Sequence, residues 1–251
     1  MAIDMKLGDF FQEIKSIPSN SFDFVYADPP YFLSNGGFTV SSGAQVSVEK
    51  GAWDSGLAPE ERSAFHNAWI KEIERVLKPT GTIVVSGTYH SIYQCVLALE
   101  NVGFKVLNEI IWFKPNGAPN LSRRRLSASH ENLVWATREE NKKFTFNYTK
   151  LREGLFEGDK IKNPGKQMRS VWWIPSTPKR EKIFGGHPTQ KPLALMRRVI
   201  IAFTSADDLV LDPFMGSGST GVACKELGRN FLGIEQSKEF FELAKMRVGA
   251  S

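Results

Sequence analysis

A glycine-rich loop with an acid at a fixed distance constrains the fold of this chain more than any other feature. The loop spans residues 212–221 and reads Asp-Pro-Phe-Met-Gly-Ser-Gly-Ser-Thr-Gly, between an apolar run and a helical pattern. Its glycines Gly216, Gly218 and Gly221 have the spacing G-x-G-x-x-G, and Glu235 ends the next apolar run. Such a loop lets the backbone approach a nucleotide cofactor, while the acid accepts hydrogen bonds from ribose hydroxyls. It therefore predicts an α/β unit that binds an adenosine-type cofactor, without saying which one.

Short apolar runs and helical patterns alternate along most of the chain. This alternation predicts a Rossmann-like, doubly wound and mostly parallel sheet, with helices on both faces. Pro79-Thr80-Gly81 predicts a turn that leads into a strand. Strands are expected at 22–27, 82–86, 106–113, 132–136, 209–211 and 230–234, and helices at 10–17, 59–77, 92–102, 192–203 and from 237 onward.

Positive charge is concentrated in one part of the sequence. The chain carries a net charge of +5, but residues 114–182 alone hold 16 basic and 7 acidic residues. A basic segment on a slightly acidic body is typical of nucleic-acid binding, although a lysine-rich surface would also explain it. Helical and strand periodicity fades within the same segment. We therefore divide the chain into 1–136, a basic insertion at 137–186, and 187–251.

The remaining composition excludes several classes of protein. With 41% hydrophobic and 24% charged residues, the chain is neither disordered nor a disulfide scaffold. Cys95 and Cys224 lie far apart and lack ligand neighbours, which favours a reducing, cytoplasmic setting and no metal. There is no signal-peptide core, and no apolar run is long enough for a bilayer. We expect a cytoplasmic protein that does not act at a membrane.

A second motif, Asp28-Pro29-Pro30-Tyr31, directly follows the first predicted strand. The exocyclic amino group of a base is a poor nucleophile, because its lone pair is delocalised into the ring. The Asp28 carboxylate and a carbonyl on the stiff proline backbone could each accept one of its N–H bonds, turning the lone pair toward a methyl donor. Tyr31 offers an aromatic face to a base taken out of the stack. Taken alone, the motif also fits a proline-rich turn.

With both motifs in place, the chain resembles the S-adenosylmethionine-dependent amino-methyltransferases of DNA. Residues 28–31 match that family's D-P-P-Y motif, and residues 212–218 match its D-P-F-x-G-S-G cofactor loop. The catalytic motif precedes the cofactor loop here, as in the permuted β class of adenine-N6 methyltransferases. The resemblance implies that 1–136 is the catalytic half and 187–251 the cofactor-binding half of one domain, interrupted by a target-recognition insertion.

The resemblance also assigns roles to residues that would otherwise read as structural. Asp9 would accept from the cofactor adenine, although it also suits a helix cap. Thr189, Gln190 and Lys191 would lie at the methionine end, although they also form a polar entry to a helix. The catalytic residues implied are Asp28, Pro29, Pro30 and Tyr31; the cofactor-binding residues are Asp9, Phe10, Asp28, Thr189, Lys191, Asp212, Pro213, Phe214, Gly216, Ser217, Gly218, Ser219, Thr220 and Glu235.

DNA is the partner that the basic segment would hold, mainly through phosphate contacts. Trp172 and Trp173 are expected to pack the insertion against the body, and the 34–51 loop is expected to close over a flipped base. His130 is expected to be architectural. Residues 119–122 and the insertion resemble methylases paired with endonucleases that cut at GATC, and the family permits a homodimer. The DNA-binding residues expected are Arg123, Arg124, Arg125, Lys142, Lys143, Lys166 and Arg169.

Three other functions remain open from the sequence. The nearest is N4-cytosine methylation, although cytosine-specific members of the family more often begin the catalytic motif with Ser than with Asp. The glycine loop alone would allow an NAD-dependent oxidoreductase, but only about 30 residues follow Gly221. The basic insertion alone would allow a non-catalytic DNA-binding module, which leaves residues 28–31 without a purpose.

Overall fold

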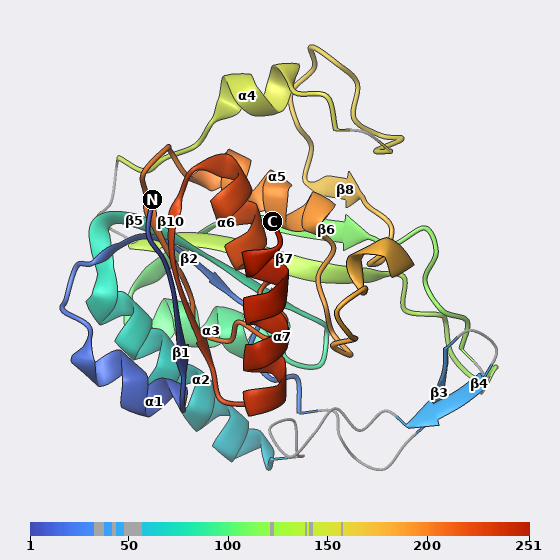
Figure 1. Ribbon diagram of the computed structural model, residues 1–251, viewed down its shortest axis with the longest axis horizontal. Helices are drawn as coiled ribbons and strands as arrows, with labels where there is room; N and C mark the ends of the chain where they lie inside the picture. Colours follow the sequence, from blue (N-terminus) through green and yellow to red (C-terminus); the bar gives the residue numbers. More distant parts are fainter. Residues whose placement is uncertain are drawn as a thin grey trace.

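A central sheet organises the chain in the computed structural model (Figure 1). The structure describes residues 1–32, 38–41, 44–47, 57–120, 123–138, 140, 143–156 and 158–251, with only the backbone described for 38–41 and 44–47. The sheet has eight strands in the order β1-β10-β9-β2-β5-β7-β6-β8. All neighbouring pairs run parallel except the two that β7 makes, with β5 and β6. The mostly parallel sheet expected from the sequence is therefore confirmed.

The helices and strands follow the alternation expected from the sequence. The strands of the sheet are β1 (Ile3–Leu7), β2 (Phe22–Ala27), β5 (Leu77–Gly87), β6 (Phe104–Phe113), β7 (His130–Arg138), β8 (Val171–Trp173), β9 (Leu209–Asp212) and β10 (Asn230–Glu235), and β3 (Phe38–Ser41) and β4 (Ala44–Ser47) form a separate hairpin. The α-helices are α1 (Phe10–Glu13), α2 (Pro59–Val76), α3 (Ile92–Val102), α4 (Tyr148–Glu153), α5 (Leu193–Phe203), α6 (Ser219–Leu227) and α7 (Lys238–Gly249). None of the described helices is long and apolar enough to cross a membrane.

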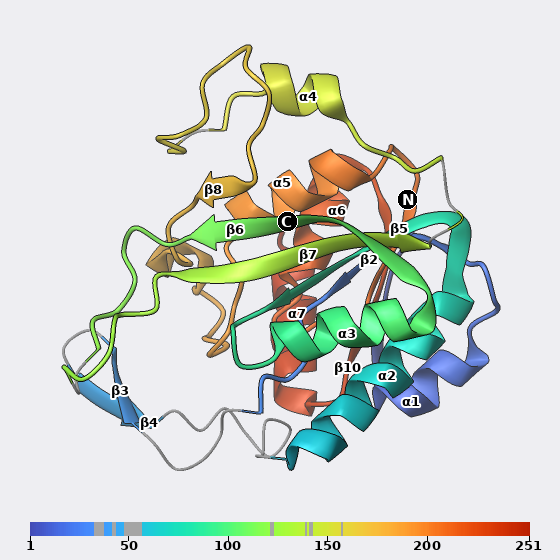
Figure 2. The same cartoon turned by 180° about the vertical axis from the view of Figure 1, so that it is seen from behind.

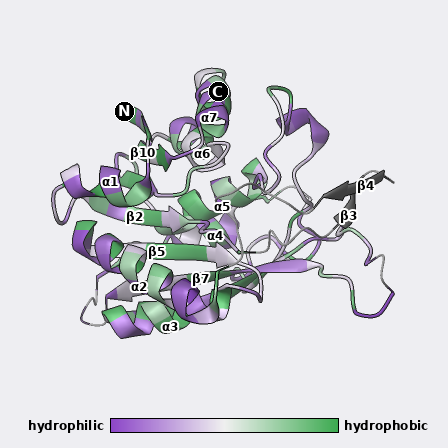
Figure 3. Cartoon of the chain, turned by 90° about the horizontal axis from the view of Figure 1, so that it is seen from below, coloured by the Kyte–Doolittle hydropathy of each residue, from purple (hydrophilic) through white to green (hydrophobic). Residues whose placement is uncertain are grey.

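Helices cover both faces of the sheet. Figure 1 shows α5, α6 and α7 on the near face, and Figure 2 shows α1, α2 and α3 on the opposite face. Successive residues of β2 point to opposite faces, so Val25 packs in the core under α2 while Phe24 packs in the core under α5. Apolar colour accordingly follows the inner helix faces and the central strands in Figure 3. The near-continuous apolar run of β2 is thus explained by burial on both sides.

The strand order has its switch point between β9 and β2, where the connections begin to run toward opposite edges of the sheet. These strands are parallel neighbours, with Phe24 paired to Val210 and Val25 to Leu211. From β9 the chain crosses to β10 on one side, and from β2 it crosses to β5 on the other side. Ligands of open α/β sheets bind at such a switch point, beyond the carboxyl ends of the strands. Both sequence motifs follow the strands that meet at this point.

Two local expectations were wrong for identifiable reasons. Residues 79–81 were expected to form a turn, but they lie inside β5. The pairing of β5 with β2 already begins at Leu77, and its register shifts between Phe22 and Phe24. A Cβ on Gly81 would lie 2.6 Å from Leu77 Cδ1, so this glycine permits a close approach within a bulge rather than a turn. Edge strand β1 was not predicted, because its alternating residues are only half-buried.

Part of the basic segment is tied to the body of the protein. Trp172 of β8 is buried in the core under α5, as expected, and β8 extends the main sheet beside β6. Arg198 of α5 donates to Asp159 at 2.6 Å, with side-chain exposures of 3% and 1%. Its guanidinium also lies 4.4 Å from the ring centroid of Phe156. This buried ion pair holds the loop after α4 against α5. The division of the chain into two halves and an insertion, with boundaries after residues 136 and 186, remains a prediction.

Replacing Asp159 with alanine should lower the free energy of unfolding by about 3 kcal/mol or more, because Arg198 would stay buried without its counter-ion. Glu242→Ala is the matched control, since the Lys245–Glu242 pair is about half exposed, and it should cost less than about 1 kcal/mol. Urea unfolding measures both variants. Equal losses would contradict the anchoring role of Asp159.

Candidate active site

Three strand ends form the floor of one cavity of about 300 Å³. Asp28 follows β2, Asp212 ends β9, and Glu235 ends β10. The segment before α5 and the start of α1 close the cavity from other sides. Every predicted catalytic residue lines it, as do all the predicted cofactor-binding residues except Gly218. Asp28 is therefore brought together at the switch point with Asp212 and Glu235, which follow it by 184 and 207 positions in the sequence.

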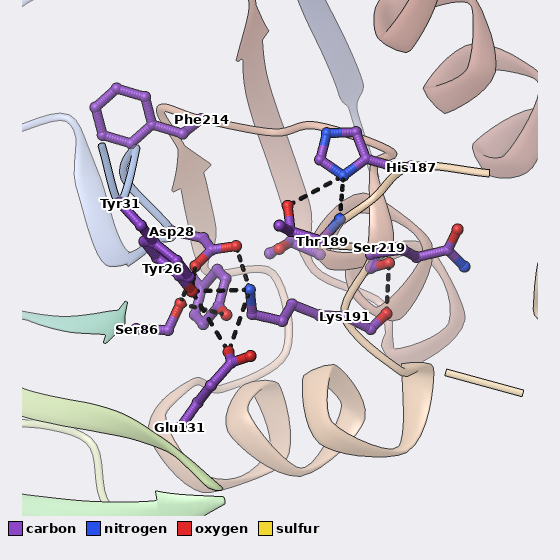
Figure 4. Close-up of polar contacts among 12 residues, drawn as sticks. Tyr26, Asp28, Tyr31, Ser86, Glu131, His187, Thr189, Lys191, Phe214 and Ser219 are labelled. Atoms are coloured by element: carbon purple, nitrogen blue, oxygen red, sulfur yellow. Dashed lines mark hydrogen bonds and ion pairs between the residues drawn. The ribbon is translucent and has the colours of Figure 1, made fainter. Parts of the chain in front are cut away.

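The Asp28 carboxylate is held by donors from three parts of the chain (Figure 4). Its Oδ1 accepts hydrogen bonds of 2.6 Å from Tyr31 Oη and of 2.6 Å from Ser86 Oγ. Its Oδ2 accepts from the ammonium of Lys191. Ser86 lies near the end of β5, so the strand next to β2 fixes one side of the carboxylate. The aspartate is thus preorganised as an acceptor at the cavity floor.

Lys191 lies deep in the site with two acidic neighbours. Its side chain is 6% exposed, and its Nζ lies 3.5 Å from Glu131 Oε2 as well as binding Asp28. Burial acts to lower the pKa of Lys191, but the two carboxylates outweigh it and raise that pKa, so the group is an ammonium. The charge of Lys191 lies at Asp28. The role in cofactor binding that was expected for the Lys191 side chain remains a prediction.

Two tyrosines beside the carboxylates remain protonated. Tyr31 is 5% exposed, and its hydroxyl lies 3.4 Å from Glu131 Oε2 in addition to binding Asp28. Tyr26 donates to Ser86 at 3.0 Å. Burial, together with the negative charge of Asp28, raises the pKa of both tyrosines well above the ordinary value. Both phenols therefore act as hydrogen-bond donors in this site.

Glu235 fixes the glycine-rich loop. Its Oε2 accepts from the backbone N–H of Gly216 at 2.8 Å, and its Oε1 accepts from that of Ser237 at 2.7 Å. Gly216 and Gly218 have φ values of 52° and 75°, which favour glycine. A Cβ on Gly216 would also lie 3.2 Å from the His187 ring. The loop conformation thus depends on these two glycines and on one carboxylate.

An aromatic wall borders the cavity next to this loop. Phe214 packs against Phe10 with ring centroids 5.5 Å apart, and against Trp69 at the same separation. Asp9 lines the cavity and also caps α1, where its carboxylate accepts from Gln12 N at 3.2 Å. The two readings of Asp9 are therefore compatible. The flat face of an adenine ring would fit against such an aromatic wall.

These features suit an adenosine cofactor that ends in a charged amino acid. The wall around Phe214 suits the adenine, and Glu235 offers carboxylate oxygens to a ribose. Gly216 lines the cavity, and the His187 ring fills the space that a side chain there would need. The N-terminus of α6, at Ser219, favours an anionic group such as a carboxylate. The residues present therefore fit the cofactor that the sequence motifs imply.

Several residues of the site were not identified from the sequence, and three of them contact the predicted motifs directly. Ser86 and Glu131 contact the catalytic motif from β5 and β7, and His187 packs against the glycine loop and accepts from Thr189 N at 3.2 Å. Their only sequence signal is a polar residue near the end of a buried strand or directly before a helix. His130 begins β7 and pairs with Phe113, as an architectural residue would.

The predicted DNA-binding residues that the structure describes are exposed. Arg123, Arg124 and Arg125 lie on the loop between β6 and β7. Lys143, Lys166 and Arg169 are also exposed, on the segment around α4. Lys142, most of the 34–51 loop and residues 121–122 lie outside the described residues, apart from the backbone of the β3–β4 hairpin. DNA contacts by these residues remain a prediction.

Known proteins are similar to this chain in sequence and in fold. A sequence model of the family described as DNA methylase matches residues 22–246. The Type II methyltransferase M2.LlaDCHI of Lactococcus lactis subsp. cremoris is 47% identical over 241 residues, which are 96% of this chain and 87% of that protein. The Type II methyltransferase M2.DpnII of Streptococcus pneumoniae is 46% identical over 243 residues, or 96% and 88%. The crystal structure of the M1.HpyAVI–SAM complex matches with a TM-score of 0.70 at 31% identity, over 98% of each chain.

The buried Asp212 should make stability depend on pH. Burial raises its pKa from 3.8 to about 7, although Thr220 Oγ1 and Phe214 N donate to it. Between these values the folded chain keeps a proton that the unfolded chain loses, so this group destabilises the fold increasingly as the pH rises toward 7.

Asp212→Asn removes that titration, and the Thr220 hydroxyl can turn to Met196 Sδ, 3.6 Å away. The variant should therefore gain stability relative to the wild type as the pH rises from about 4 to about 7, by roughly 2–4 kcal/mol in all. Urea unfolding at several pH values measures this difference. A difference that does not vary with pH would show that Asp212 is charged in the folded state throughout.

Proposed function

The chain belongs to the DNA methylase family, and from that membership we propose that it is a site-specific adenine-N6 DNA methyltransferase. S-adenosylmethionine is its cofactor. The observation that carries the proposal is the preorganised acceptor Asp28, which lies in the same cavity as the glycine loop and Glu235. A methyl donor held by that loop and a base held at Asp28 would therefore meet within one site.

The residues of this chain would prepare the base rather than attack it. Bound S-adenosylmethionine supplies an electrophilic methyl group. The Asp28 carboxylate accepts from the amino group of a flipped base and stabilises the positive charge that develops on nitrogen. The Pro29 carbonyl accepts the second N–H bond, and the Tyr31 ring stacks against the base. Neither a metal nor a covalent bond between enzyme and base is needed.

The cofactor would be held by residues from both motifs. Glu235 takes the ribose, Asp9 the adenine amino group, and Thr189 with Lys191 lies toward the methionine end. The remaining contacts with the cofactor would come from the side chains and backbone of the glycine loop and from Phe10. This assignment is supported by the lining of the cavity, in which Pro213, Ser217, Ser219 and Thr220 also take part.

Adenine is favoured over cytosine by the Asp that begins the catalytic motif. The relatives above are named as Type II methyltransferases, which supports a role for this protein beside a restriction endonuclease with the same recognition site. We place the enzyme in the cytoplasm with its DNA substrate. The exposed basic residues of the insertion hold that DNA, GATC is the first site to test, and a homodimer is a further proposal.

Replacing Asp28 with alanine should abolish transfer of labelled methyl groups to DNA, because the amino group loses its charged acceptor. Binding of S-adenosylhomocysteine should change little, as calorimetry can measure. Asp4→Ala, an exposed aspartate of β1, is the control and should keep full activity. Full activity of the Asp28 variant would disprove the mechanism.

DNA from cells that express the protein should contain N6-methyladenine. Hydrolysis to nucleosides followed by mass spectrometry identifies the product, and modification-sensitive sequencing then gives the site. N4-methylcytosine would show that the base assignment is wrong. GATC sequences left unmodified beside another modified site would discard only the proposed target sequence.

A further inference from the structure

We propose that Glu131 is a positioning residue that receives the Lys191 ammonium when a target amino group binds Asp28. This inference rests on the proposed function. In the resting enzyme Lys191 neutralises the catalytic carboxylate and occupies the acceptor that the base requires. Glu131 then gives the ammonium a second carboxylate within reach, so that Asp28 is released to the base.

The competition follows from the hydrogen bonds of Asp28. Tyr31 and Ser86 both donate to Oδ1, each at 2.6 Å, and Lys191 donates to Oδ2. A base amino group is also a donor, and because Oδ1 already accepts two hydrogen bonds, the base would have to share Oδ2 with the ammonium. An ammonium left there would also oppose the positive charge that develops on the amino nitrogen. Productive binding is therefore favoured when Lys191 moves away from Oδ2.

The structure supplies one nearby destination for the ammonium. In the described part of the chain, Asp28 and Glu131 are the carboxylates within 4.0 Å of Lys191 Nζ. The distance to Glu131 Oε2 is already 3.5 Å. A small side-chain rotation can exchange one carboxylate for the other, and the ammonium never becomes a buried charge without a counter-ion.

Glu131 is itself held in place for this role. It lies on β7 and is 9% exposed. Its Oε1 accepts from Lys114 Nζ at 2.5 Å, which leaves Oε2 facing Lys191 and the Tyr31 hydroxyl. Figure 4 shows Glu131 and Asp28 on opposite sides of the Lys191 ammonium. The lysine thus lies between two fixed carboxylates, which come from strands on either side of β5.

The test measures how tightly the enzyme binds the target amino group, apart from methyl transfer. The affinity of the enzyme is measured, with S-adenosylhomocysteine present, for two unmethylated oligonucleotides that contain its recognition sequence. One has adenine at the target position and the other has purine. Purine lacks the amino group. The free-energy cost of extruding each base depends on the DNA and is the same for every enzyme variant. It therefore cancels when the ratio of the affinity for adenine to the affinity for purine is compared between the wild type and a variant.

Glu131→Gln should lower this ratio by roughly tenfold and slow single-turnover methylation by a similar factor, since Lys191 stays on Asp28. Binding of S-adenosylhomocysteine should change less than about twofold. Lys191→Met should raise the ratio, because it removes the competitor. In that background, Glu131→Gln should have no further effect. Glu109→Gln removes the charge of another carboxylate, which accepts from Asn132 on the neighbouring strand, and it should leave the ratio unchanged.

Three results would overturn the inference. The ratio could be unaffected by Glu131→Gln, it could fall equally in the Lys191→Met background, or Lys191→Met alone could fail to raise it. The last measurement decides the matter even if the Glu131 variant does not fold. Failure of the proposed function is distinct, since the wild type would then yield N4-methylcytosine. Oligonucleotides with cytosine or its analogue without the amino group would then test the same exchange.

Discussion

The site depends on a carboxylate that is largely buried, with 14% of its side chain exposed, at the junction of two parallel strands. β2 and β9 are neighbours, and their carboxyl ends place Asp28 beside the loop that follows Asp212. β5 adds the Ser86 hydroxyl from the other side. The order of the strands therefore decides the chemistry, because only neighbouring strand ends can bring an acceptor for the base and a cradle for the cofactor into one cavity.

Partial burial of this carboxylate requires compensation by nearby charge. Asp28 and Glu131 are matched by Lys191 and Lys114, so the four groups are neutral together. An isolated buried charge would be costly, whereas a neutral cluster with short hydrogen bonds is tolerated. The same cluster explains why the lysine, expected at the methionine end of the cofactor, instead has its charge at the catalytic aspartate.

Much of the fold and of the site could be predicted from the sequence. Glycine spacing, the apolar run of β2 and the proline pair after it are local signals, and they located Glu235, the loop and Asp28. Contacts between distant strands have no such signal. Glu131 and Ser86 became site residues only because β5 and β7 follow β2 in the sheet. The half-buried strand β1 was missed because edge strands lack a strong apolar pattern.

A crystal structure of the enzyme with S-adenosylhomocysteine and a duplex with its target site tests the central claim most directly. We expect the adenine N6 to lie about 3 Å from an Asp28 carboxylate oxygen, at hydrogen-bond distance. Lys191 Nζ should then lie on Glu131. An extruded adenine whose amino group is bound elsewhere, with Lys191 still on Asp28, would contradict it.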